Sequence, residues 1–345
     1  MNTALLEKPG ESATVTKEGL YAELKKLIDE KGLLKKQPLY YGIKVPLTYV
    51  FVALSCLLLV LADNLWIRLL DAIFLAFMTV QVGFVGHDAG HRAIFRSIRL
   101  NDILGLFNGF FLGASFSWWM DTHNRHHGKP NQQSFDPAID YTIMAFSEEQ
   151  ACRKRGFQRF MVKHQALFFI PLLMLYPINM RVQSFRYLVS ERSRYKWIEL
   201  TSLLLHFPVY FLFLYLNLGL WQTLLFAVIH QSLFGLYLSS VFVPNHMGMP
   251  TLREDEDLDF VRQQVITARN IKGSRIVDFL FGGLNFQIEH HLFPSMPRNR
   301  LRQARKIVHD FLQNNSITYY ETRFLQSFQE ILSDLRRVSN SISPG

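Results

Sequence analysis

The sequence is poor in cysteine, which excludes several kinds of site. Its 345 residues include only two cysteines, Cys56 in an apolar run and Cys152 in a basic segment. Two thiols placed in this way support neither a disulfide framework nor an iron–sulfur site built on cysteine. We interpret each as a plain structural thiol.

The chain also lacks an apolar stretch of signal-peptide type before Pro46, so the first apolar run is expected to be retained. Acidic residues are in the minority, because 28 Asp and Glu stand against 37 Lys and Arg, a formal net charge of +9. The basic residues lie between apolar runs rather than on a recognisable nucleic-acid-binding module. We therefore expect them to face a membrane surface, and we expect no nucleic acid partner.

Long apolar runs are abundant, since hydrophobic residues make up 49% of the chain. A helix of about 20 apolar residues crosses the hydrocarbon core of a bilayer. Four such runs occur as two pairs, each joined by a short turn: 45–62 with 67–86, and 197–216 with 220–243. The sequence therefore predicts an all-α integral membrane protein with four transmembrane helices in two hairpins, interfacial helices and a helical cap that holds a histidine-rich dimetal site.

The remaining segments predict one domain behind a polar start. Residues 1–44 are polar, and four of them at helical spacing predict an amphipathic helix on the bilayer or on the cap: Leu20, Leu24, Leu27 and Ile28. Residues 45–345 are expected to form a single domain, with 87–196 and 244–345 supplying the cap.

Each hairpin would leave and re-enter the membrane on one side, so the polar segments collect on one face. Lys and Arg are concentrated in these segments, and by the positive-inside rule this face is cytoplasmic. Two shorter apolar stretches, 100–119 and 166–180, are interrupted by glycine or proline. Because of these interruptions we interpret both as interfacial or re-entrant. A complete crossing by either alone would break the one-sided arrangement.

Histidine is the residue that carries the chemistry. It occurs in three clusters, H-D-A-G-H, H-N-R-H-H and Q-I-E-H-H, with these members: His87 and His91; His123, His126 and His127; Gln287, His290 and His291. Spacings of three and four place side chains on one face of a helix. Imidazole suits Fe, Zn, Cu and Ni, and without a cysteine cluster the pattern favours more than one oxygen-handling metal ion over a structural zinc.

Further donors are needed because Gln287 stands where a histidine would complete the third cluster, and an amide oxygen is a weaker ligand. His246, in V-P-N-H at the end of the fourth apolar run, is the candidate on topology, with Asn245 beside it. Asp88 and Glu289 are adjacent to candidate ligands and could orient imidazole N–H groups or bind metal directly.

The other histidines are expected to have no metal role. His206 and His230 lie inside predicted membrane helices, where packing or hydrogen bonding is the better interpretation. His230 precedes His246 by roughly 24 Å of helix, too far to share its metal. His164 and His309 fall in basic segments that we expect to be exposed.

With these clusters in place, the chain resembles the membrane-bound fatty acid desaturases, whose boxes read H-x3/4-H, H-x2/3-H-H and [HQ]-x2-H-H. The third box in its setting, N-F-Q-I-E-H-H-L-F-P, is similar to that of front-end desaturases and related bacterial acyl desaturases. The resemblance implies a non-haem diiron centre with O2 as co-substrate. It implies these iron ligands: His87, His91, His123, His126, His127, His290, His291 and, matching a family histidine before the third box, His246.

The resemblance also implies a reaction and its partners. We expect a cis double bond to be inserted into a fatty acyl chain linked to CoA or lipid, and the third box implies front-end (delta-5 or delta-6) regioselectivity. Many eukaryotic front-end members carry a fused cytochrome domain with an H-P-G-G motif, but the first histidine here is His87. A separate donor, a ferredoxin or a flavin/iron–sulfur reductase, is therefore expected to dock on the basic face.

Two groups of residues are candidates for substrate contact. Phe116, Trp118 and Trp119 precede the second box and would line an acyl tunnel near the metals or form an interfacial aromatic belt. Four arginines would bind phosphates of CoA or of a phospholipid, or would belong to a surface-anchoring helix: Arg298, Arg300, Arg302 and Arg305.

Three other functions remain open at this point. A hydroxylase of the same histidine-rich membrane class would share the metal site and differ only in the fate of the substrate. A metal or haem transporter would need ligands distributed across the bilayer rather than gathered at one surface. An accessory binding subunit would load iron without turnover.

Overall fold

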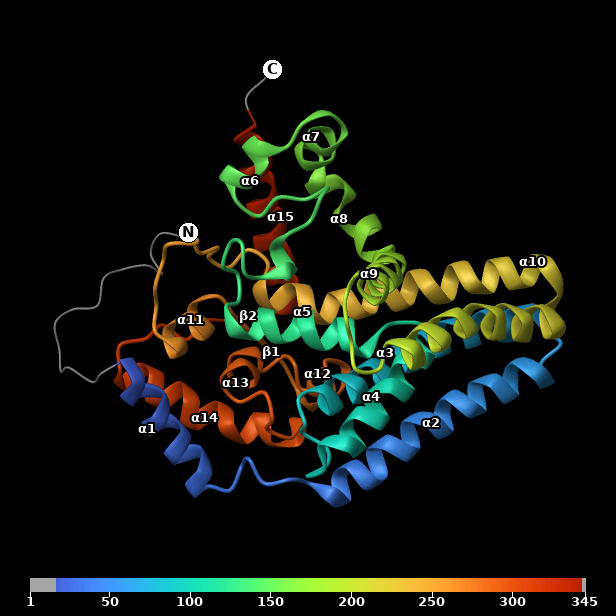
Figure 1. Ribbon diagram of the computed structural model, residues 1–345, viewed down its shortest axis with the longest axis horizontal. Coiled ribbons are helices and arrows are strands. Elements are labelled where there is room, and N and C mark those ends of the chain that lie inside the picture. Colours follow the sequence, from blue (N-terminus) through green and yellow to red (C-terminus); the bar gives the residue numbers. More distant parts are fainter. Residues whose placement is uncertain (1–16, 343–345) are drawn as a thin grey trace. The chain divides into compact units, whose positions relative to one another are not determined.

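The computed structural model describes residues 17–342, most of which lie in helices (Figure 1). The helices are α1 (Lys17–Glu30), α2 (Pro38–Leu61), α3 (Leu65–Gly90), α4 (Ile98–Leu112), α5 (Phe116–Gly128), α6 (Glu148–Arg153), α7 (Gly156–Lys163), α8 (Gln165–Met174), α9 (Tyr176–Ser190), α10 (Lys196–His246), α11 (Phe260–Ile266), α12 (Arg275–Leu280), α13 (Gln287–Leu292), α14 (Arg298–Asn314) and α15 (Phe324–Asn340). Two short strands, β1 (Asn270–Lys272) and β2 (Glu321–Arg323), pair in parallel. The predicted helical membrane fold is confirmed, with this strand pair as an unpredicted addition.

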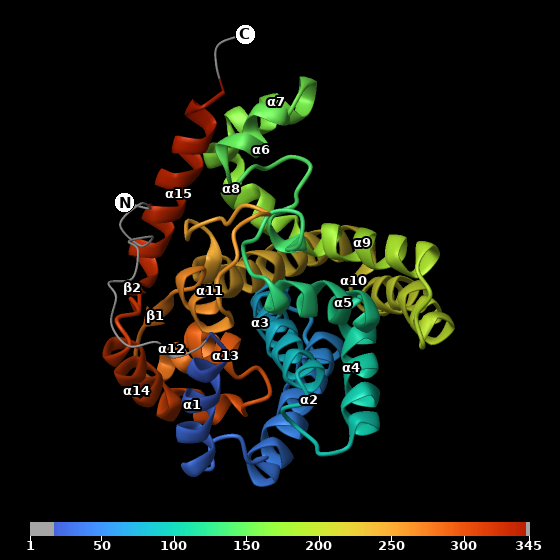
Figure 2. The same cartoon turned by 60° about the vertical axis from the view of Figure 1, so that its left-hand side comes forward.

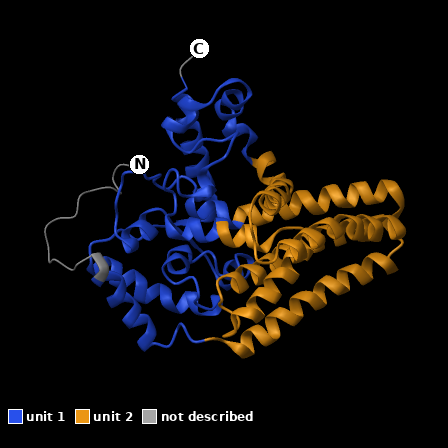
Figure 3. Cartoon of the chain, in the orientation of Figure 1, with its two compact units in different colours: residues 1–35, 122–169, 241–345 blue, residues 36–121, 170–240 orange. Residues whose placement is uncertain are grey.

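The chain forms two compact units, each assembled from separated stretches of sequence (Figure 3). Unit 1 is built from the stretches up to Lys35, from Thr122 to Phe169 and from Val241 onward. Unit 2 is built from residues 36–121 and 170–240. The second and third histidine boxes and His246 therefore belong to unit 1, and the first box belongs to unit 2.

Three helices of the described chain, α2, α3 and α10, are long and apolar enough to cross a membrane. α10 folds back on itself, because Gly219 has a non-helical backbone with φ 70° and ψ 175°. The Tyr210 hydroxyl lies 2.8 Å from Nδ1 of His230, 20 residues further on. A straight helix of that length would separate them by roughly 30 Å. The two arms of α10, visible in Figure 1, and the α2–α3 pair are the two predicted hairpins.

These helices extend beyond the apolar runs that predicted them. α2 begins at Pro38 rather than at residue 45, and α3 continues to Gly90 rather than ending at residue 86. Proline suits the first helical turn because its missing N–H has no partner to lose there. A criterion based on hydropathy ends a helix at its first polar residues, and for this reason it missed the turn of α3 that carries the first histidine box.

Two pairs of shorter helices pass the same test only if each pair is taken as one bent span. These are α4 with α5, bent by 107°, and α8 with α9, bent by 72°. The last carbonyls of α4 receive hydrogen bonds from side chains far away in sequence. Nδ1 of His206 donates to Phe110 O at 2.8 Å, and Nη2 of Arg181 donates to Leu112 O at 3.2 Å. A helix that ends away from water requires such donors, and His206 has the hydrogen-bonding role expected of it.

Unit 1 has its own apolar core, to which α1 contributes. Leu20, Leu24 and Ile28 are buried together with residues of α11, α13 and α14, including Phe293 and Leu301. Figure 2 shows α1 beside α14. Of the two predicted positions for the amphipathic helix, the contacts of α1 correspond to the cap, because three of its four predicted apolar residues are covered by protein and only Leu27 is exposed.

Candidate metal centre

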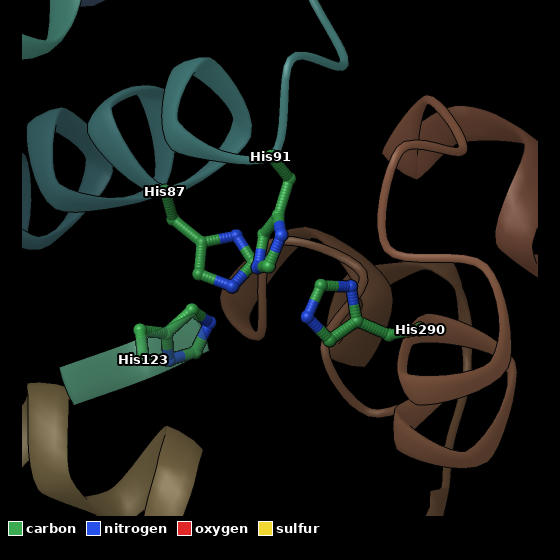
Figure 4. Close-up of side chains that lie close together, drawn as sticks. All are labelled: His87, His91, His123 and His290. Atoms are coloured by element: carbon green, nitrogen blue, oxygen red, sulfur yellow. The ribbon is translucent and has the colours of Figure 1, made fainter. Parts of the chain in front are cut away.

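The first histidine box lies at the end of α3, where His87 and His91 are one turn apart. Their ring centroids are 4.6 Å apart, and Figure 4 shows both rings at this end of the helix. Asp88 accepts a hydrogen bond from the Tyr41 hydroxyl at 2.8 Å, whereas its other oxygen is 3.6 Å from Nδ1 of His87, beyond hydrogen-bond length. Asp88 therefore fastens the end of α3 to α2.

Two glycines make room for aromatic rings beside this box. A Cβ atom on Gly90 would lie 2.1 Å from Cζ3 of Trp119, and one on Gly105 would lie 2.3 Å from Cε2 of Phe116. The two rings stack at an interplanar angle of 14°, and the Trp119 ring centroid lies 5.6 Å from that of His87. Phe116 and Trp119 thus form an aromatic wall next to the first box. Phe116 is buried, and Trp118 and Trp119 are both partly exposed.

Gly90→Ala should therefore disturb the first box. The new methyl group overlaps the Trp119 ring, and overpacking of this kind costs about 1–3 kcal/mol of stability. Thermal unfolding of the purified protein should show a lower midpoint, and Trp119→Leu in the same chain should restore part of the loss. The matched control is Gly42→Ala in α2, where a Cβ meets no atom within 4 Å. An unchanged midpoint for Gly90→Ala would contradict the close packing of the Trp119 ring on Gly90.

The second box, the third box and His246 come together inside unit 1. They reach it from the last turns of α5, from α13 and from the last residue of α10. Nε2 of His127 is 3.1 Å from Nε2 of His123, and the ring centroids of His127 and His290 are 4.8 Å apart. Figure 4 also shows His123 and His290, whose ring centroids are 6.5 Å apart. The unit therefore collects six of the eight predicted ligands.

Three of the six form a compact group. His126, His246 and His291 each offer one ring nitrogen, and these nitrogens all lie within 4.8 Å of one another. Nε2 of His126 is 3.3 Å from Nε2 of His246. The ring of His291 is buried, with its centroid 4.5 Å from that of His246 and 5.0 Å from that of His126.

The opposite nitrogen of each ring makes a hydrogen bond to an oxygen atom. Nδ1 of His126 is 2.8 Å from Asp136 Oδ2, Nδ1 of His246 is 2.9 Å from the Thr267 carbonyl, and Nδ1 of His291 is 2.7 Å from Gln264 Oε1. A carbonyl or carboxylate oxygen only accepts, so each Nδ1 carries a proton and each neutral ring keeps its lone pair on Nε2. One ring nitrogen of each residue lies near those of the other two, and a cation among them would accept their lone pairs. The donor set therefore fits a transition-metal ion.

Asp136 and Gln264 hold two of these imidazoles, and sequence reasoning missed both. Both belong to unit 1 and are buried, and Gln264 also donates from its amide to the His127 carbonyl at 2.9 Å. Burial alone would raise the pKa of Asp136, but His126 and the backbone N–H groups of Asn131 and Ala138 together hold this pKa below its ordinary value. Asp136 is therefore a carboxylate. Nothing in their spacing relative to the boxes identified either residue.

Gln287 and Asn245 form a pair next to His246. The amide nitrogen of Asn245 donates to Gln287 Oε1 at 3.0 Å, and it also lies 3.0 Å from the Leu284 carbonyl. The amide nitrogen of Gln287 lies 2.9 Å from Nε2 of His246 and donates to it. The structure thus places Gln287 at the Nε2 edge of His246, with Asn245 hydrogen-bonded to it from the other side.

Glu289 has its partners elsewhere. It is fully buried, and its two oxygens accept hydrogen bonds from the Tyr319 hydroxyl at 2.6 Å and from the Asn270 amide at 2.7 Å. Burial raises the pKa of this carboxyl group, against the lowering effect of the two hydrogen bonds. Its contacts attach α13 to the segments around β1 and β2, so its effect on His290 and His291 passes through the backbone.

Comparison with known proteins agrees with this site. The sequence profile of the family described as fatty acid desaturase matches residues 64–323, which is more than half of the chain. The chain belongs to the fatty acid desaturase family. The resemblance inferred from the three boxes is confirmed, and the matched region includes all eight predicted ligands.

The similarity to individual members of the desaturase family extends over most of this chain. It is 30% identical over 338 residues to the acyl-lipid (9-3)-desaturase of Physcomitrium patens, covering 93% of this chain and 63% of the moss protein. It is 30% identical over 339 residues to the delta(6)-fatty-acid desaturase fat-3 of Caenorhabditis elegans, covering 93% of this chain and 75% of that protein. It is 28% identical over 326 residues to the delta(8)-fatty-acid desaturase of Euglena gracilis, covering 91% and 77%.

Proposed function

We propose that this protein is an O2-dependent desaturase that introduces a cis double bond into a fatty acyl chain. The observation that carries the proposal is the group formed by His126, His246 and His291, whose Nε2 lone pairs converge while each Nδ1 is fixed by an oxygen acceptor. Membership of the desaturase family supports the same conclusion. The apolar hairpins support it as well, because a protein that lies in a membrane can reach acyl chains there. Iron is the proposed metal.

The chemistry requires an oxidant, because a methylene group in an acyl chain has no acidic proton that a side chain could remove. Two irons, when bound, would supply with O2 the oxidising power for breaking two neighbouring C–H bonds. Two electrons and two protons from a donor balance the reaction, so that one O2 leaves as two waters. The chain itself has to hold the ligands, keep the reacting carbons in place and exclude water.

The iron ligands proposed here are the box histidines and His246. His126, His246 and His291 would hold one iron, since their protonated Nδ1 atoms leave Nε2 for the metal. The other box histidines are proposed as further iron ligands on the strength of the box spacing: His87, His91, His123, His127 and His290. Phe116 and Trp119 are proposed as part of the acyl-binding wall, because they pack against the first box.

The proposed substrate is a chain that already contains a double bond, as a CoA thioester or within a lipid. Three relatives carry names of front-end type: acyl-lipid (9-3)-desaturase, delta(6)-fatty-acid desaturase and delta(8)-fatty-acid desaturase. We propose that the new double bond enters between the existing one and the carboxyl end. Electrons would come from a separate donor, a ferredoxin or a flavin/iron–sulfur reductase, attracted by the net charge of +9 to a cytoplasmic metal-bearing face.

Expression in a host that lacks such activity tests this function. Cells supplied with defined saturated and unsaturated acyl chains should accumulate a new alkene from the unsaturated substrate, measured by gas chromatography with mass spectrometry. Cells that carry the empty vector are the control. Accumulation of a hydroxylated chain instead of an alkene would contradict desaturation, and metal uptake without any oxidised lipid would contradict an enzyme of this class.

A further inference from the structure

Arg269 is a fully buried arginine next to the metal-binding residues of unit 1. Its guanidinium group donates through Nε to the Pro244 carbonyl and through Nη2 to the Met247 carbonyl. Its third side-chain nitrogen, Nη1, lies 2.7 Å from Glu330 Oε2, and its backbone N–H donates to the Asn245 carbonyl at 2.9 Å. One residue thus binds three carbonyls that flank His246.

These carbonyls need partners because they lie at the end of α10. The last carbonyls of a helix have no N–H group one turn further along, and they are costly to bury without a donor. The His246 carbonyl accepts from the amide nitrogen of Asn131 at 3.1 Å and from the backbone N–H of Met249 at 3.1 Å. Every carbonyl from Pro244 to Met247 is therefore held by Arg269 or Asn131.

Arginine suits this position better than lysine. The planar guanidinium group presents its N–H donors in a fixed fork, so that two carbonyls and one carboxylate can be bound at once. Glu330 is itself held, because its Oε1 accepts from the Tyr320 hydroxyl at 2.7 Å and from the Gln326 amide at 3.1 Å. The buried charge of Arg269 is thereby paired. The carboxylate that orients its guanidinium group is held in place on α15.

We propose that Arg269, oriented by Glu330, is a positioning residue that fixes the backbone of His246 and thus directs this imidazole into the metal site. This inference rests on the proposed function, since it takes His246 as an iron ligand. Arg269 touches neither the metal position nor the substrate. Its effect passes through the end of α10, whose last turn would otherwise fray and carry the ligand with it.

Metal binding by the full-length protein in detergent tests this role. Co²⁺ serves as the probe, since its visible absorption reports coordination directly and requires no turnover. Arg269→Gln should weaken Co²⁺ binding about 10–100-fold, as loss of a group that orients a ligand does. Arg269→Lys and Glu330→Gln should each weaken Co²⁺ binding less than Arg269→Gln does. The matched control is Arg337→Gln, which removes an exposed arginine paired with Glu148 and Asp334 on the same unit.

A double variant separates positioning from general stability. If Arg269 acts through His246, adding Arg269→Gln to a His246→Ala chain should cause no further loss of Co²⁺ affinity. Additive losses, or full Co²⁺ affinity in folded Arg269→Gln protein, would overturn the proposal. If Arg269→Gln fails to fold, Arg269→Lys and Glu330→Gln provide the same comparison. Full Co²⁺ affinity in His246→Ala itself would instead overturn the ligand assignment on which the proposed function depends.

Discussion

Replacing His126 by alanine is expected to abolish product formation and to remove metal from the protein. The side chain contributes one of the three ring nitrogens of this group, and its Nδ1 is held by Asp136, which leaves Nε2 for the metal. Product would be measured by gas chromatography of lipids from expressing cells, and iron would be measured per purified chain. Both should fall together, since the oxidising power depends on the metal.

His164→Ala is the matched control for this experiment. His164 lies outside the boxes and packs against Phe160, with ring centroids 4.9 Å apart, so it tests the loss of an imidazole as such. His309 would be a poorer control, because its ring contacts Tyr319, which binds Glu289 within the third box. Retention of both iron and product in His126→Ala would remove this residue from the ligand set.

Asp136→Asn is expected to reduce activity and iron affinity about 10–100-fold without unfolding the protein. The aspartate accepts from His126 and from Asn131 N–H on one oxygen, and from Ala138 N–H on the other. An asparagine has only one acceptor oxygen, so its NH2 group must face at least one of these donors. The His126 ring then loses either its orientation or the charge that strengthens its Nε2 as a donor to metal.

The measurement for Asp136→Asn is an iron titration of the apo-protein combined with product analysis. Asp140→Asn is the matched control, since Asp140 is an exposed carboxylate four residues further along the same segment. The control should retain full iron affinity. Wild-type iron affinity in Asp136→Asn would mean that the carboxylate contributes only to the turn after α5.

The sequence predicted those features whose cause is local or periodic. The box spacings identified the histidines because an interval of three or four residues has a direct meaning on a helix. Long apolar runs identified the hairpins for the same reason. His246 was found by counting along the chain, since the end of the fourth run had to emerge on the same face as the end of the second.

The residues that orient the ligands could not be predicted in this way. Asp136 is ten residues from His126, Gln264 is 27 from His291, and Glu330 is 61 from Arg269. A hydrogen bond between such partners depends on how loops and helices pack and leaves no period in the sequence. Asp88 and Glu289, which are adjacent in sequence to candidate ligands, hydrogen-bond to Tyr41 and to Tyr319 and Asn270, respectively. These partners are also far away in sequence and could not be predicted from the boxes.

The assembly of unit 1 from three separated stretches has a consequence for biosynthesis. His126, His246 and His291 leave the ribosome in that order, and the last of them follows both hairpins. A growing chain inserted as far as α10 thus holds no more than two members of the triad. The triad is complete only after α13 has been translated, so the proposed iron site would be filled late in the maturation of this protein.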